Sequence, residues 1–131
     1  MDELPIRTGD DVVRVRQQVR VVAAKSGLSL VDQTKVVTAA SELARNALVH
    51  GGGGLARIDV VTSALGRNGI KIGFTDEGPG IADIDLALTD GWTSGDGLGL
   101  GLSGARRLVD EFELTSKPGD GTSVVVVKWS R

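Results

Sequence analysis

The chain has 131 residues, of which 40% are hydrophobic and 24% are charged, and its formal net charge is −2. These values are ordinary for a globular protein and predict one domain over residues 1–131, with no reason to expect nucleic acid or a membrane surface as partner. The absence of cysteine excludes disulfides and thiolate metal sites.

The N-terminus lacks the apolar region of a signal peptide, and no apolar run reaches the roughly 18 residues that span a membrane. We therefore expect a cytoplasmic protein, with no nucleic-acid or membrane partner.

Two helices are predicted in the first part of the chain. Apolar residues recur at helical spacing over 11–26, with Arg14, Arg16 and Arg20 between them. We expect these arginines to form a solvated helix face, with binding of an acidic partner as the alternative. Ser29 is the predicted N-cap of a second amphipathic helix that runs to about His50. The glycine run at 51–54 stops that helix.

Two hairpins and a third helix follow. The runs 55–62 and 70–74 are rich in β-branched residues or alternate apolar with polar residues, which predicts an antiparallel hairpin. Helical spacing over 98–110 predicts the third helix, and strands 111–116 and 122–129 flank a Pro-Gly-Asp-Gly turn. This order predicts an α+β fold, a two-layer sandwich with helices on one face of a mixed, mostly antiparallel sheet.

Glu42 and Asn46 are four residues apart, so they share one face of the second helix. Most polar helix faces are simply solvated, and that interpretation is open for this pair. A carboxamide oxygen next to a carboxylate also suits a metal–triphosphate site. The amide oxygen is a hard ligand for Mg²⁺, and the carboxylate can deprotonate a hydroxyl.

Asp76 to Gly80 form the string DEGPG at the predicted end of a strand. Such residues commonly make an ordinary turn. Alternatively, the Asp76 carboxylate accepts a hydrogen bond from the exocyclic amine of a base. Gly78 and Gly80 then let the base lie against the backbone, because they carry no Cβ.

The string GLGLGL at 97–102 opens the third predicted helix at a cost of about 1 kcal/mol for each glycine relative to alanine. Gly97, Gly99 and Gly101 would expose successive N–H groups at a helix N-terminus, which is a natural seat for phosphates. The spacing is not that of a dinucleotide fold, and no GxxxxGK[ST] string exists, which excludes a P-loop.

Taken in this order, the three strings resemble the N-box and the two glycine boxes of the GHKL superfamily of ATP-binding domains. The resemblance implies the Bergerat fold, ATP as ligand and a lid at about 82–96 that includes Trp92, Thr93 and Ser94. It also implies a role for each matching residue. Asn46 would coordinate Mg²⁺ through ATP, Asp76 and Thr122 would bind the adenine side, Gly78 and Gly80 would shape the base pocket, and Gly97, Gly99 and Gly101 would hold phosphates.

Within the superfamily, the chain resembles the RsbT-type stressosome serine/threonine switch kinases, most specifically at 38–46, 74–81, 97–114 and 128–131. Gyrase-, MutL- and Hsp90-like members need further domains. A sensor histidine kinase needs a helical hairpin with a phospho-accepting histidine. The segment before the N-box is too short for that hairpin, so we expect neither class.

This resemblance implies phosphoryl transfer from Mg·ATP to a Ser or Thr of a STAS-domain partner in a bacterial partner-switching pathway, with Glu42 as the catalytic base or its positioner. It also implies that the released kinase binds and activates a PP2C-type phosphatase. We expect a monomer. Two alternatives are an anti-sigma factor serine kinase that sequesters a sigma factor, and a nucleotide-gated binding module without catalysis.

Overall fold

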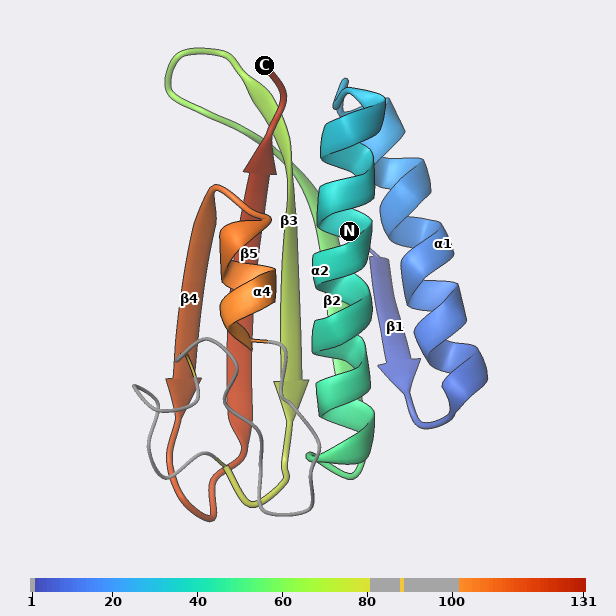
Figure 1. Ribbon diagram of the computed structural model, residues 1–131, viewed down its shortest axis with the longest axis vertical. Coiled ribbons are helices and arrows are strands. Elements are labelled where there is room, and N and C mark those ends of the chain that lie inside the picture. Colours follow the sequence, from blue (N-terminus) through green and yellow to red (C-terminus); the bar gives the residue numbers. More distant parts are fainter. Residues whose placement is uncertain (1, 81–87, 89–101) are drawn as a thin grey trace.

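The computed structural model describes residues 2–80, 88 and 102–131. Within these residues, the chain forms three helices and five strands (Figure 1). In chain order they are β1 (Asp2–Ile6), α1 (Gly9–Lys25), α2 (Leu30–Val49), β2 (Gly54–Thr62), β3 (Asn68–Asp76), α4 (Leu102–Arg107), β4 (Glu111–Ser116) and β5 (Thr122–Trp129).

The two long helices begin at side chains that cap them. Ser29 accepts a hydrogen bond from the Asp32 amide at 3.2 Å, which confirms it as the N-cap of α2. Helix α1 begins earlier than predicted, because Thr8 and Asp11 form a reciprocal capping box at its start. In this box the Asp11 carboxylate accepts from the Thr8 amide at 3.1 Å.

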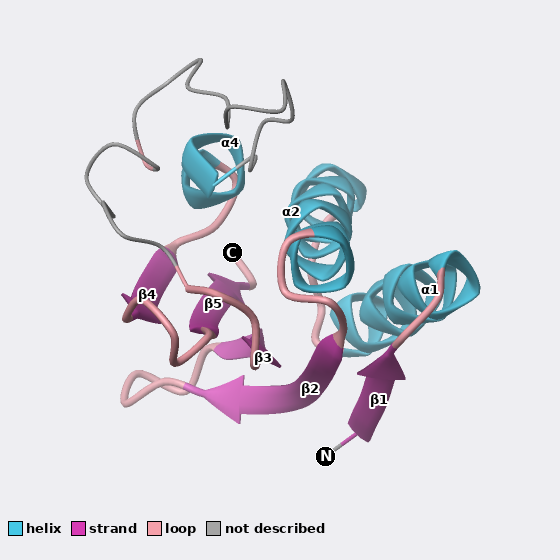
Figure 2. Ribbon diagram, turned by 90° about the horizontal axis from the view of Figure 1, so that it is seen from below, coloured by secondary structure: helices cyan, strands magenta, loops and turns pink. Residues whose placement is uncertain are grey.

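The five strands form one sheet in the order β1-β2-β3-β5-β4, and each pairing within the described residues is antiparallel. The three described helices cover one face of the sheet (Figure 2), which confirms the predicted two-layer α+β architecture. Strand β1 was not predicted. It is an edge strand whose residues Asp2–Ile6 pair with Ile58–Gly54 of β2.

The core lies between the helices and this sheet face. Helix α2 contributes buried side chains such as Leu43 and Val36, while α1 contributes Val15 and Val19. The sheet meets them with alternate residues, as a strand covered on one face requires. These sheet residues are Ala56, Ile58, Ile70, Ile72, Phe74, Val124 and Val126.

One polar contact joins the two long helices. Arg16 on α1 is half-buried, and its Nε donates to the Ser41 hydroxyl on α2 at 3.0 Å. The expectation of a solvated face was therefore wrong for Arg16, whereas Arg14 and Arg20 are exposed. Arg16 lies within reach of the neighbouring helix, where its guanidinium finds a hydroxyl acceptor.

Helix α4 ends at Arg107, although the prediction extended it to Asp110. The chain leaves the helix because Leu108 makes a tighter turn, its amide donating to the Ala105 carbonyl at 3.1 Å. The Asp110 amide then donates to Val127 of β5 at 2.9 Å, so it already belongs to the sheet. The predicted first turn of this helix, 98–101, lies outside the described residues.

Candidate functional site

Asp76 is the last residue of β3 and lies at the end of the sheet where the neighbouring strands β2 and β5 begin. It pairs with Gly54 of β2 on one side and with Thr122 of β5 on the other. Strand β5 lies between β3 and β4, so residues 46 positions apart in the sequence become neighbours (122 minus 76). Asp76 and Thr122, both predicted to bind the base, are thus adjacent.

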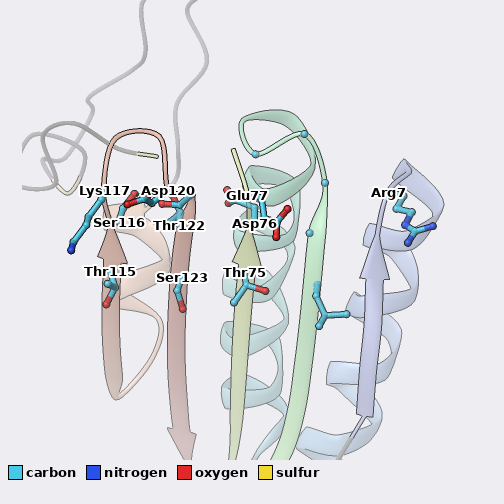
Figure 3. Close-up of a pocket in the computed structure, with 16 residues that line it drawn as sticks. Arg7, Thr75, Asp76, Glu77, Thr115, Ser116, Lys117, Asp120, Thr122 and Ser123 are labelled. Atoms are coloured by element: carbon cyan, nitrogen blue, oxygen red, sulfur yellow. Dashed lines mark hydrogen bonds between the residues drawn. The ribbon is translucent and has the colours of Figure 1, made fainter. Parts of the chain in front are cut away.

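An open cleft of about 1030 Å³ lies at this end of the sheet. Its size is at the upper end of the range for small-molecule sites, about 300–1,000 Å³. Figure 3 shows the labelled side chains at the ends of β3, β4 and β5, with Arg7 across the cleft from them. The lining residues are Arg7, the stretch 51–55, Thr75, Asp76, Glu77, Thr115, Ser116, Lys117 and 120–123.

Two of the predicted glycines shape the turn after Asp76. The Gly78 amide donates to Asp76 Oδ1 at 2.9 Å, which holds one oxygen of the carboxylate. Gly80 has a φ of +77°, and a Cβ there would lie 2.1 Å from the Lys117 carbonyl oxygen. No larger residue fits at Gly80 without displacing the turn between β4 and β5.

A pair of hydroxyl groups lies beside Asp76 at the ends of β4 and β5. The Ser116 and Thr122 hydroxyl oxygens are 3.0 Å apart, and Ser116 also donates to the Gly121 carbonyl at 2.8 Å. Ser116 was not singled out from the sequence, because its place opposite Thr122 depends on the register of β4 with β5.

Glu42 and Asn46 lie on α2, and both are half-buried. Both side chains are therefore partly exposed on one helix face, and their role stays a prediction. Neither residue lines the cleft described above. The backbone of Asn46 nevertheless reaches its edge, since its carbonyl accepts from the Gly51 amide at 3.1 Å and from the His50 amide at 2.9 Å.

The glycine run at 51–54 lines the cleft, although the sequence interpretation treated it only as the end of a helix. It connects α2 to β2 and passes directly beside Asp76. The sequence signal that could have revealed this role is the run itself. A single glycine suffices to end a helix, and the additional ones allow close approach of another chain segment.

The remaining predicted residues lie outside the described part of the chain. These are Gly97, Gly99 and Gly101 of the phosphate loop, together with Trp92, Thr93 and Ser94 of the predicted lid. Helix α4 begins at Leu102, the residue that follows the phosphate-loop glycines. In the part of the chain that the structure describes, no helix has the length and apolar composition to cross a membrane.

The fold and the sequence together define the class of this protein. The sequence model of the histidine kinase-, DNA gyrase B- and HSP90-like ATPases matches residues 31–130. The chain belongs to this family, which confirms the GHKL resemblance and nucleotide use as the family's chemistry.

Relatives within the family narrow the class further. The chain is 45% identical over 126 residues to the serine/threonine-protein kinase RsbT of Bacillus subtilis, covering 96% of this chain and 94% of that one. It is 31% identical over 117 residues to the anti-sigma F factor of a Thermoanaerobacter species, covering 87% and 82%. The prediction of an ATP-dependent serine/threonine protein kinase is confirmed as the class of enzyme.

Solved structures agree on the fold. The RsbU and RsbW domains of Rv1364c from Mycobacterium tuberculosis superpose with a TM-score of 0.65 at 23% identity, over 100% of this chain but 33% of that one. The catalytic domain of histidine kinase ThkA superposes with a TM-score of 0.54 at 15% identity, over 99% and 97%. At these identities the likeness concerns the fold alone.

Proposed function

We propose that this chain, acting as a single domain in the cytoplasm, transfers the γ-phosphoryl group of ATP to a Ser or Thr of a STAS-domain partner. The observation that carries the proposal is the 45% identity to a serine/threonine-protein kinase over 96% of the chain. The grouping of Asp76, Thr122 and the glycine run at 51–54 at one cleft supports the same function.

The base would bind at the cleft. The Asp76 carboxylate would accept from the exocyclic amine of adenine, with Thr122 on the same side and Gly78 and Gly80 as backbone walls. A carboxylate and a hydroxyl next to a glycine-lined wall fit a flat base with a polar edge. The phosphates would be held by the remaining predicted glycines, Gly97, Gly99 and Gly101.

Asn46 would hold Mg²⁺ through its side-chain oxygen. This donor fits the ion, because Mg²⁺ prefers oxygen ligands and takes few of them from protein when phosphates supply the rest. When bound, the ion would neutralise charge on the phosphates. Asn46 lies four residues from Glu42 on the same helix, so the metal and the base would act from one face.

Glu42 would act as the base that accepts the proton of the partner's hydroxyl, or would position that hydroxyl. Its half-buried location limits its contact with water while leaving the carboxylate within reach of a docked partner. The hydroxyl must approach in line with the bond that breaks, so the partner would dock over α2.

The kinase would then act as a switch in a stress-response pathway that regulates a sigma factor. After phosphorylating its stressosome STAS partner, the released monomer would bind and activate a PP2C-type phosphatase. The principal alternative is an anti-sigma factor serine kinase, which the 31% identity to an anti-sigma F factor favours. A non-catalytic, nucleotide-gated binding module is the third candidate.

Transfer of ³²P from ATP to candidate STAS proteins tests the catalytic proposal. We expect transfer by the wild type with Mg²⁺, and a loss of roughly 10²- to 10⁴-fold for Glu42→Gln with nucleotide affinity unchanged. Glu113→Gln is a matched control, since Glu113 on β4 is exposed and does not line the cleft. Full activity of Glu42→Gln would remove Glu42 from the mechanism.

Pull-down experiments separate the leading function from the anti-sigma alternative. Purified chain would be mixed with PP2C-type phosphatases and with sigma factors from the same genome, with and without ATP. We expect capture of a phosphatase. Stoichiometric capture of a sigma factor would instead establish the anti-sigma kinase. Binding without phosphoryl transfer to any STAS protein would favour the non-catalytic module.

A further inference from the structure

Gly51 lies in direct contact with the side chain of Asp76. A Cβ placed on Gly51 would lie 2.4 Å from Asp76 Cγ and 2.5 Å from Asp76 Cβ, distances that real Cβ atoms do not show. The same Cβ would lie 2.7 Å from the Ala47 carbonyl oxygen. The carboxylate thus occupies space that any other residue at position 51 would need.

Gly78 closes the opposite side of this contact. A Cβ on Gly78 would lie 2.5 Å from Gly51 Cα and 3.1 Å from Asp76 Oδ1. The two glycine backbones therefore pack directly on each other beside the carboxylate, and the Gly78 amide holds Oδ1 at 2.9 Å. From the described part of the chain, no hydrogen bond reaches Oδ2.

Backbone hydrogen bonds to the end of α2 hold Gly51 in its position. Its amide donates to the Asn46 carbonyl at 3.1 Å, and the Gly53 amide donates to Ala47 at 2.8 Å. The end of the helix that carries Asn46 therefore sets the position of Gly51. The end of α2 and the end of β3 therefore meet where Gly51 contacts Asp76.

We propose that Gly51 is a positioning residue that sets the orientation of the Asp76 carboxylate and thereby determines specificity for the 6-amino group of the purine base. This inference rests on the proposed role of Asp76 in adenine binding. A methyl group at position 51 would rotate the carboxylate out of its place against Gly51 and Gly78. The charged hydrogen bond to the exocyclic amine would then be lost, while the rest of the cleft would stay intact.

The test compares the affinity for ATP with that for purine riboside 5′-triphosphate, which lacks the 6-amino group. The wild type should bind ATP about tenfold to a hundredfold more tightly, since a hydrogen bond to a charged group has that value. Gly51→Ala should reduce this ratio to near one, as Asp76→Ala does, and leave the affinity for the analogue within about threefold of wild type. Gly73→Ala is the matched control, because a Cβ at Gly73 on β3 meets nothing within 4 Å.

The possible outcomes separate the two proposals. If Gly51→Ala weakens both nucleotides equally and keeps the wild-type ratio, Gly51 has only a structural role and the inference is overturned. If the wild type itself shows a ratio near one, the contact between Asp76 and the base fails, and with it the proposed role of Asp76. General damage to the fold changes both affinities together and does not reproduce a selective loss of the ratio.

If Gly51→Ala does not fold, the double variant Gly51→Ala with Asp76→Gly is tested in its place. The Asp76→Gly background removes the side chain that the new methyl group would meet. We expect Gly51→Ala to fold in that background, with a thermal midpoint near that of Asp76→Gly alone. If it stays unfolded, the conflict is with the Ala47 carbonyl rather than with Asp76, and the inference is overturned.

Discussion

The hydroxyl oxygens of Ser116 and Thr122 lie 3.0 Å apart beside the cleft, and Ser116 donates its hydrogen to the Gly121 carbonyl at 2.8 Å. A serine hydroxyl has one proton, so Thr122 is the donor within the pair. The Thr122 oxygen therefore presents lone pairs, and not a proton, to a ligand in the cleft.

Replacing Ser116 by alanine should weaken ATP binding by about twofold to tenfold, the value of one neutral hydrogen bond. The change removes the acceptor that orients the Thr122 proton. Isothermal titration calorimetry measures the effect. Thr62→Ala serves as the control, because Thr62 lies at the far end of β2 and does not line the cleft. Equal affinities for both variants and the wild type would show that the hydroxyl pair does not contribute to binding.

Replacing Asn46 by alanine should weaken binding of ATP by at least about tenfold when Mg²⁺ is present. With EDTA in place of Mg²⁺ the affinity should change little, because the lost group is a metal ligand. Asn46→Asp retains an oxygen donor and should keep most of the dependence on Mg²⁺. The same loss with and without Mg²⁺ would contradict a metal-binding role for Asn46.

Replacing Thr8 by alanine should lower the free energy of unfolding by about 1 kcal/mol, the usual cost of losing an N-cap. Thr8 accepts the Asp11 amide at 3.3 Å, and alanine offers no acceptor for it. Urea denaturation followed by circular dichroism measures the loss. Thr8→Ser keeps the acceptor and should stay within a few tenths of a kcal/mol of wild type.

The pKa of Asp11 is lowered, chiefly by the hydrogen bond from the Arg7 amide, with Thr8 and Arg14 adding to the effect. A carboxyl group with a lower pKa in the folded state stabilises the fold when ionised. This stability is complete above the unfolded pKa of about 3.9 and is lost as the pH falls through the folded value. Asp11→Asn should therefore flatten the fall in unfolding free energy below about pH 4. Identical pH profiles for variant and wild type would rule this out.

Lys128 is buried, with its side chain 5% exposed, and its ammonium group lies 3.4 Å from Asp110 and 3.6 Å from Asp32. Lys128→Ala should lower the free energy of unfolding by about 3–5 kcal/mol, since it leaves carboxylates without their buried partner. Lys128→Met keeps the packing of the stem, so its cost should be smaller. In both variants Arg131 still lies 2.6 Å from Asp110 and 3.8 Å from Asp32. Thermal and chemical denaturation of both variants measure the difference. A loss below about 1 kcal/mol for Lys128→Ala would contradict the prediction.

Local patterns in the sequence were sufficient to predict most of the elements. Ser29 caps α2 because its side chain reaches an amide only three residues away, and such a signal needs no tertiary contact. The hairpin strands are specified by β-branched residues around short turns. The ATPase family followed from three short strings, since each is a local pattern that can be recognised without any tertiary contact.

The remaining features of the fold and of the site were decided by the tertiary structure alone. The contacts that produce these features join residues that are distant in the sequence. Strand β1 exists only through its pairing with β2, so the segment 2–6 carries no strong signal of its own. Arg16 is half-buried because α2 happens to present Ser41 to it. Likewise, the sequence determined that Asp76 ends a strand at a glycine turn. Only the meeting of the α2 end with β3 placed Gly51 against its carboxylate, because a steric limit between two segments is invisible until both are folded.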